Sequence, residues 1–142
     1  MANKMDEIIV VAPRNEVFNN EKLTFQGVET KKYNVKQITE HLCRTYSTMR
    51  RGDAEENPAY KQPIPYVTIK RGNQVFSYKR LTGGGEARLH NQISIGVGGH
   101  LNDVPGLDFN GVVADGLQRE LEEELFINKD NLTLTTVGLI ND

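Results

Sequence analysis

The chain has 142 residues, of which 37% are hydrophobic and 25% charged, as in one ordinary globular domain. No stretch approaches the roughly 18 apolar residues of a membrane-spanning helix. The single cysteine, Cys43, excludes an internal disulfide framework and a cysteine-rich zinc site. A net charge of −2 gives no electrostatic reason to expect nucleic-acid binding. The first residues lack the apolar segment of a signal peptide, so we expect a cytoplasmic location.

The N-terminal part is predicted to form a strand and a long helix. The apolar run at residues 7–12, closed by Pro13, indicates a strand, and a second short strand is expected near residues 23–28. Apolar side chains then recur at three- and four-residue steps, which predicts an amphipathic helix over residues 35–50 that stops at Gly52. Polar residues 53–62 are expected to form a linker.

The C-terminal part is predicted to contain short strands and one further helix. Two runs rich in β-branched and aromatic residues, 66–70 and 74–78, flank a Gly-Asn turn and indicate a hairpin. A glycine-rich loop at 82–86, a strand at 92–97, a helix at 111–126 capped by Asn110 and a final strand at 132–137 follow in order.

The helix predicted at 111–126 carries an unusual concentration of carboxylates. Glu120, Glu123 and Glu124 are spaced i, i+3 and i+4 and therefore share one face, whereas Glu122 should point to solvent. Like charges at this spacing destabilise an isolated helix, and carboxylate oxygens suit hard ions such as Mg²⁺ or Mn²⁺. On spacing alone, a solvated glutamate-rich face is the commoner explanation, so both interpretations stay open here.

The surroundings of this helix resemble the Nudix box of the Nudix (MutT-like) hydrolases. A predicted strand ends in Gly98-Gly99, a loop follows, and the helix then carries the run Arg119-Glu120-Leu121-Glu122-Glu123-Glu124. The similarity is closest to predicted MutT-family phosphoesterases whose box starts with Gly-Gly-His-Leu-Asn. It implies an α+β fold, namely a Nudix-like α/β/α sandwich with a mixed β-sheet.

The resemblance also implies how the chain is organised. Residues 1–60 correspond to an N-terminal strand–helix extension, and residues 61–142 to a Nudix-like domain. Since few residues follow the box helix, we expect this domain to be incomplete at its C-terminus. A sheet edge left open in this way favours association, so a homo-oligomer is among the expected partners, beside a small-molecule substrate.

The implied function is Mg²⁺- or Mn²⁺-dependent hydrolysis of a diphosphate bond in a nucleoside diphosphate derivative, the reaction of a Nudix pyrophosphohydrolase. In that case Glu120, Glu123, Glu124 and the backbone carbonyl of Gly99 hold the metal. Glu123 serves as general base or bridging ligand, and Arg119 braces the loop. A non-catalytic Nudix-like binding or regulatory module, an inactive fragment and a Nudix-fold isomerase acting on a diphosphate remain as alternatives.

The sequence departs from the family pattern in three ways. The pattern puts the box arginine 14 residues after its opening glycine, whereas Arg119 follows Gly99 by 20 residues, so the loop is longer by six. Gly111 occupies the position of the first box glutamate, which normally pairs with the arginine, and Phe126 replaces the terminal glycine. Three aspartates are candidates to pair with the arginine instead, although none is in register: Asp103, Asp108 and Asp115.

Three features outside the acidic face are assigned structural roles. His100, beside the predicted site, is expected to make an ordinary hydrogen bond rather than to contact phosphate. Arg88 is expected to be a surface charge. The glycines at residues 83–85 lack the Gly-Lys-Ser/Thr ending of a phosphate-binding loop, so we expect a hinge.

Overall fold

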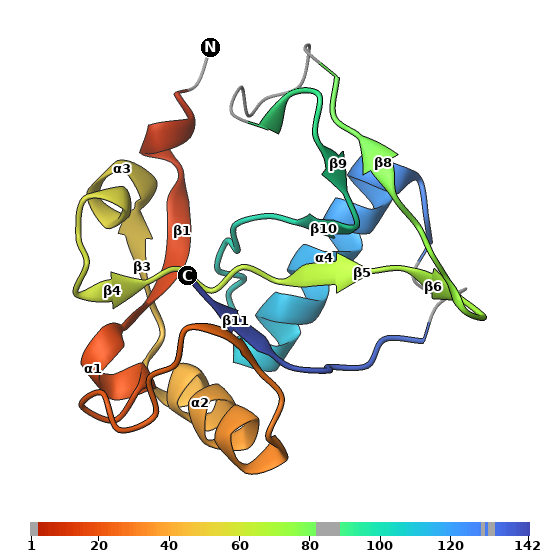
Figure 1. Cartoon of the computed structure of the whole chain (residues 1–142). Helices are drawn as coiled ribbons and strands as arrows, with labels where there is room; N and C mark the ends of the chain where they lie inside the picture. The colour runs from red at the N-terminus through yellow and green to blue at the C-terminus, as the bar shows by residue number, and fades with distance from the viewer. Residues whose placement is uncertain (1–2, 82–88, 129, 131–132) are drawn as a thin grey trace.

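The computed structural model describes residues 3–81, 89–128, 130 and 133–142 (Figure 1). The glycine-rich loop at 82–86 and Arg88 lie outside these residues. None of the described helices has the length and apolar composition needed to cross a membrane. The helical elements are η1 (Lys4–Asp6), α1 (Arg14–Val17), α2 (Lys32–Thr45), α3 (Arg51–Glu55) and α4 (Phe109–Leu125).

The strands are short, and every pairing in the described part of the chain is antiparallel, where the resemblance implied a mixed sheet. They are β1 (Ile8–Pro13), β2 (Gly27–Glu29), β3 (Ser47–Arg50), β4 (Tyr60–Lys61), β5 (Tyr66–Thr68), β6 (Lys70–Arg71), β7 (Gln74–Val75), β8 (Tyr78–Lys79), β9 (Ile93–Ser94), β10 (Gly96–Gly98) and β11 (Leu139–Asn141). The predicted α+β class is confirmed.

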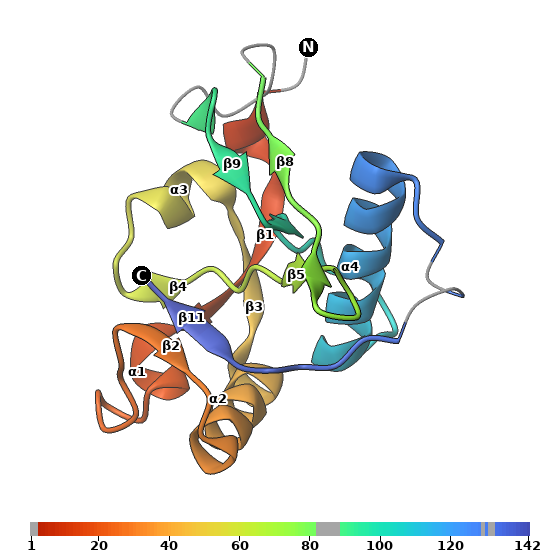
Figure 2. The same ribbon diagram turned by 45° about the vertical axis from the view of Figure 1, so that its right-hand side comes forward.

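Strand β1 is the centre of a three-stranded sheet with the order β3-β1-β4. Its uninterrupted apolar sequence is explained by burial on both faces. Ile9 and Val11 pack with Ala54 of α3, while Val10 and Ala12 face the opposite side, toward α2 and α4. Figure 2 shows α3 and α4 on opposite sides of β1, so helices cover both faces of this small sheet.

The N-terminal strand and the box helix share one core cluster. Val10 packs against Leu101, Phe109 and Val112, and none of these four side chains is more than 4% exposed. The backbone N–H of Val10 also donates to the carbonyl of Leu101 at 2.8 Å. The segment that leads into α4 is therefore attached to β1 by both apolar packing and a backbone hydrogen bond.

The helix predicted over residues 35–50 is wrong in its second part. Helix α2 ends at Thr45, and Tyr46 has the extended angles φ −62° and ψ 148°. Residues Ser47–Arg50 then form β3, in which Met49 pairs with Ile9 of β1. Pairing with a buried strand outweighs the helical spacing, which Tyr46 and Met49 only continue by coincidence. Gly52, expected to stop the helix, lies inside α3, which runs into the stretch 53–62 expected to be a linker.

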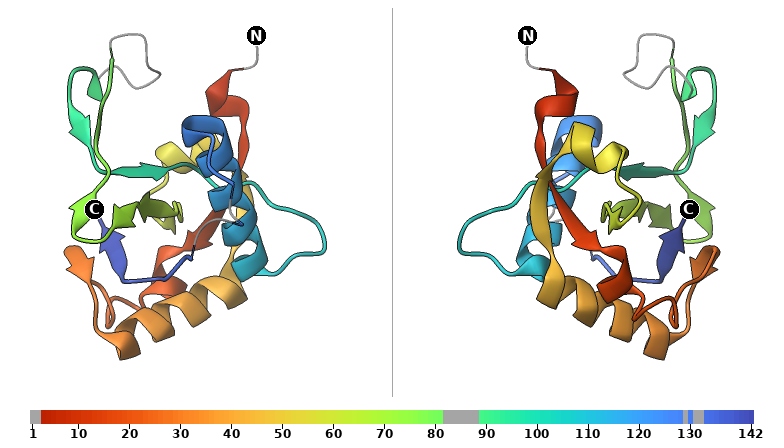
Figure 3. Two further views of the ribbon diagram at one scale, coloured as in Figure 1. Left: turned by 90° about the vertical axis from the view of Figure 1, so that its right-hand side faces the viewer. Right: turned by 90° about the vertical axis from the view of Figure 1, so that its left-hand side faces the viewer.

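The predicted hairpin is present as shorter pieces. Strands β6 and β7 pair around Gly72, whose φ of +62° suits the turn. The flanking strands pair elsewhere, β5 with β10 and β8 with β9, so the strand predicted at 92–97 is divided in two. Figure 3 shows β8 and β9 as an arm on the side of the molecule opposite the loop that leads into α4.

The last predicted strand is displaced along the chain. The described residues of 132–137 form no strand, and the strand at this end is β11. It pairs with β2, with Leu139 opposite Glu29, and the exposed Val137 stays outside the pairing. The edge of β2 thus finds its partner more than a hundred residues away, which no local pattern indicates.

Candidate active site

The predicted carboxylates lie in the last two turns of helix α4, which is packed against the rest of the molecule. The helix begins two residues earlier than predicted, and its cap is Asp108 rather than Asn110, because the Asp108 side chain accepts a hydrogen bond from the backbone N–H of Gly111 at 2.9 Å. Val112 and Leu121 are each only 1% exposed, and they lie on opposite sides of the helix, with Val112 in the core cluster around Val10.

Glu120 lies against the backbone of Gly99. A Cβ placed on Gly99 would collide with the Glu120 carboxylate, so a larger residue here would displace that carboxylate from the backbone of the loop. The structure therefore brings together two residues that are 21 positions apart in the sequence.

The pKa of Glu120 is raised above its ordinary value, chiefly because the carboxylate is half-buried. The negative charges of Glu124 and Glu123 raise the pKa further, and the nearby guanidinium of Arg119 partly offsets them. The charge of Glu7, from the segment before β1, also acts to raise this pKa. A group with such surroundings gains from a cation beside it.

Glu123 and Glu124 are exposed on the same part of α4. Glu122 is also exposed and accepts a hydrogen bond from the Gln118 side chain at 3.0 Å. The carboxylate oxygens of these glutamates are the kind of ligand that Mg²⁺ and Mn²⁺ prefer. As they stand, however, no three His, Cys, Asp or Glu side chains within the described residues are close enough together to hold one ion.

Arg119 contacts two side chains, neither of them the first box glutamate. Its Nε lies 3.5 Å from Oδ2 of Asp115, one helical turn back, so one of the three candidate aspartates does pair with it. Its Nη1 donates to Oδ1 of Asn102 at 3.3 Å. Asp108 is instead the cap of α4.

Asn102 is the residue of this site that sequence reasoning missed. Its Nδ2 donates to Oε1 of Glu7 and to the carbonyl of Ile8, both at 2.9 Å. The asparagine itself was visible in the Gly-Gly-His-Leu-Asn start of the box. No spacing in the sequence connects it with Glu7, which lies 95 residues earlier.

His100 makes the ordinary hydrogen bond expected of it. Its Nε2 lies 2.8 Å from Oε1 of Gln62, and a carboxylate oxygen of Glu55 is 4.0 Å away. These contacts tie the loop to the end of α3 and to the segment that follows it.

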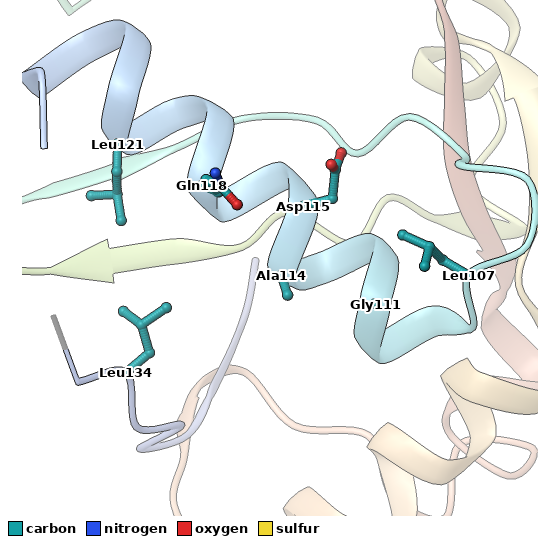
Figure 4. A pocket seen from close by; sticks show the side chains of 7 residues that line it. All are labelled: Leu107, Gly111, Ala114, Asp115, Gln118, Leu121 and Leu134. Carbon is teal, nitrogen blue, oxygen red and sulfur yellow. The ribbon is translucent and has the colours of Figure 1, made fainter. Parts of the chain in front are cut away.

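A hollow of about 280 Å³ lies along α4, on the side of the helix away from Glu120, Glu123 and Glu124 (Figure 4). Figure 4 shows Leu121 and Leu134 pointing toward each other across it. Its lining is mainly apolar and consists of Leu107, Gly111, Ala114, Asp115, Gln118, Leu121 and Leu134. A second hollow, of about 690 Å³, lies at the β6–β7 hairpin and is lined in part by Arg71 and Phe76.

Two known proteins are similar to this chain. Protein YmaB of Bacillus subtilis (strain 168) is 55% identical over 141 residues, which cover 98% of this chain and 68% of the relative. A crystal structure of Tm1382, described as "a putative Nudix hydrolase", has a TM-score of 0.70 and 30% identity. The match covers 95% of this chain and 66% of that one, so the chain spans about two thirds of the length of each relative. No family model matches the sequence.

Proposed function

Because this chain belongs to the family of Protein YmaB and has a Nudix-like fold, we propose that it hydrolyses a diphosphate bond in a nucleoside diphosphate derivative, with Mg²⁺ or Mn²⁺ as cofactor. The observation that carries the proposal is the half-buried Glu120 carboxylate, which lies against Gly99 and has Glu123 and Glu124 beside it. Three like charges on one face of a helix, one of them half-buried, favour a cation beside them.

In this proposal Glu120, Glu123, Glu124 and the carbonyl of Gly99 hold the cation. When bound, a divalent cation neutralises charge on the phosphate oxygens. Glu123 and Glu124 are exposed, and binding one cation together with Glu120 requires their side chains to turn toward it.

The chain's own residues supply the rest of the reaction. Glu123 orients a water molecule and accepts its proton while the water oxygen attacks phosphorus. The bond from that phosphorus to the bridging oxygen breaks, and the bridging oxygen leaves with the second phosphate. Arg119 does not touch the reacting atoms in this scheme and positions the loop that carries Gly99.

The test uses the intact protein with Mg²⁺ and a panel of nucleotides, dinucleoside polyphosphates and nucleotide sugars, with release of phosphate and pyrophosphate as the measurement. We expect Glu123→Gln and Glu124→Gln each to lower turnover by at least about tenfold, the usual scale for loss of such a group. Both variants should melt cooperatively near the wild-type temperature, since their side chains are exposed.

Glu122→Gln is the matched control, because it removes the same charge from the same helix at a position that faces away. It should keep wild-type turnover. Near-normal activity in both Glu123→Gln and Glu124→Gln would exclude this face as a metal site. The second candidate, a non-catalytic binding module, is favoured by Gly111 in place of the first box glutamate, and a Mn²⁺ site without any hydrolysis would support it.

The proposal includes a small-molecule substrate, a cytoplasmic location and no membrane or nucleic-acid partner. A homo-oligomer through an open sheet edge stays a prediction.

A further inference from the structure

We infer that Asn102 and Glu7 are positioning residues of the proposed site, which together hold Arg119 in place of the missing first box glutamate. This inference rests on the proposed function. In this inference the segment before β1 helps to fix the position of Arg119 on the box helix. Three contacts carry it: Arg119 to Asn102, and Asn102 to both Glu7 and the Ile8 carbonyl.

The orientation of the Asn102 amide follows from its neighbours. Both hydrogens of Nδ2 have acceptors at 2.9 Å, one on Glu7 and one on Ile8. The remaining oxygen faces Nη1 of Arg119 at 3.3 Å. Turning the amide over would place its NH₂ group against a guanidinium and its oxygen against two acceptors. A carboxylate at position 102 could not satisfy all three neighbours, because it has no hydrogen to donate.

The partners of Asn102 are themselves held in place. The backbone N–H of Arg51 donates to the carbonyl of Glu7 at 2.8 Å, and the Arg51 guanidinium lies 3.7 Å from the Glu7 carboxylate. Leu101, next to Asn102 in the chain, is 1% exposed and bonded to Val10. Glu7 and Asn102 therefore meet on rigid backbone.

Two consecutive residues of α4 contact the two ends of one short loop segment. Glu120 lies against Gly99, and Arg119 bonds to Asn102. The Arg119 contact thus fixes the distance between the loop and the helix at the point where the proposed ligands meet. Misplacement of the Gly99 carbonyl by even a fraction of an ångström would impair a metal site.

Asp115 cannot replace this support. Its contact with Arg119 lies within α4, is 3.5 Å long and involves side chains that are both about 40% exposed. An exposed pair one helical turn apart contributes little, and it ties the arginine to its own helix and not to the loop or to β1.

The test is an exchange of amide and acid. Asn102→Asp should lower kcat by about tenfold or more, with KM within about threefold, because it sets a carboxylate against Glu7 and removes both donors. Adding Glu7→Gln should raise kcat by at least about threefold over Asn102→Asp, since the new amide donates to the new carboxylate, while the Ile8 carbonyl stays without its donor. Glu7→Gln alone should have a small effect, because its amide oxygen still accepts from Asn102.

The matched control combines Asn102→Asp with Glu29→Gln. Glu29 accepts a hydrogen bond from Asn34 in another carboxylate–amide pair, between β2 and α2, so this variant has the same net charge as the exchanged one. It should remain impaired. The inference is overturned if Asn102→Asp keeps wild-type kcat, if Glu7→Gln restores nothing, or if Glu29→Gln restores activity equally well.

A second readout needs neither metal nor substrate. The Arg119 guanidinium protons should give a slowly exchanging NMR signal in the wild type and in the exchanged variant, and lose it in Asn102→Ala, which removes the oxygen that accepts from Arg119. If the wild type hydrolyses nothing, the proposed function fails, while this signal still decides how Arg119 is held. Equal signals in all variants would overturn the inference.

Discussion

Glu120 combines burial and repulsion at a single carboxyl group. The backbone of Gly99 removes solvent from one side of it, and Glu124 and Glu123 add negative charge on another. Both effects favour the protonated form, so the pKa is raised. Without a cation, the ionised Glu120 carboxylate therefore destabilises the folded protein. A role in cation binding would explain why a destabilising residue occurs at this position.

The pH dependence of stability follows from this pKa. The folded protein binds the Glu120 proton more tightly than the unfolded chain, so the penalty is absent below the ordinary glutamate pKa of about 4.3 and develops as pH rises through the raised folded value. We expect Glu120→Gln to raise the melting temperature in chelator at pH 7–8 but not near pH 4. Glu122→Gln is the control for net charge, and an equal gain from both variants at pH 7–8 would contradict the assignment.

At the scale of the element, the residue that ends α4 differs from the box pattern, and this difference affects the backbone conformation. Phe126 stands where the family has glycine, and it adopts the left-handed angles φ 56° and ψ 32°. Its N–H still donates to the carbonyl of Glu122, so the helix ends in the usual way. The side chain is 91% exposed and gains little from packing, so the strain has no local compensation.

Phe126→Gly should therefore stabilise the protein, by about 0.5–1 kcal/mol, because glycine adopts this conformation without the clash of a Cβ. Urea unfolding monitored by circular dichroism would measure the change. Phe126→Ala is the matched control and should bring no comparable gain, since alanine keeps the Cβ. A similar gain from both variants would mean that the phenyl ring, and not the backbone, is unfavourable.

At the scale of the whole molecule, the N-terminal strand and the box helix depend on each other. Val10 of β1 packs with Leu101, Phe109 and Val112 in one cluster, and Asn102 links Glu7 to Arg119 across the same junction. The boundary predicted between residues 60 and 61 remains a prediction, but these contacts cross it.

Leu101→Ala should lower the free energy of unfolding by about 2–5 kcal/mol, because Leu101 is 1% exposed and its removal leaves a cavity. Probes in β1 and in α4 should lose structure in one transition in denaturant titrations. Leu107→Ala, at a leucine that is 42% exposed, is the control and should cost much less. Separate transitions for the two probes would show that the parts fold independently.

Local patterns account for much of the fold and fail at particular places. The apolar run of β1 and the periodic helix α4 were predictable, because burial and helical spacing are properties of neighbouring residues. The apolar spacing of α2 continues through Ser47–Arg50 and therefore predicts helix there, although these residues form a strand. Strand β3 exists because the edge of β1 offers hydrogen bonds to it, and β11 because the edge of β2 does.

The same division applies to the site. Sequence alone determined the acidic face of α4, since the positions of Glu120, Glu123 and Glu124 around a helix follow from their spacing. Only the tertiary structure decided what holds Arg119, because Asn102 and Glu7 meet through packing of β1 against the loop after β10. Such contacts form only where the folded backbone brings residues together that are far apart in the sequence. Spacing along the chain does not specify which of these residues will be close in space.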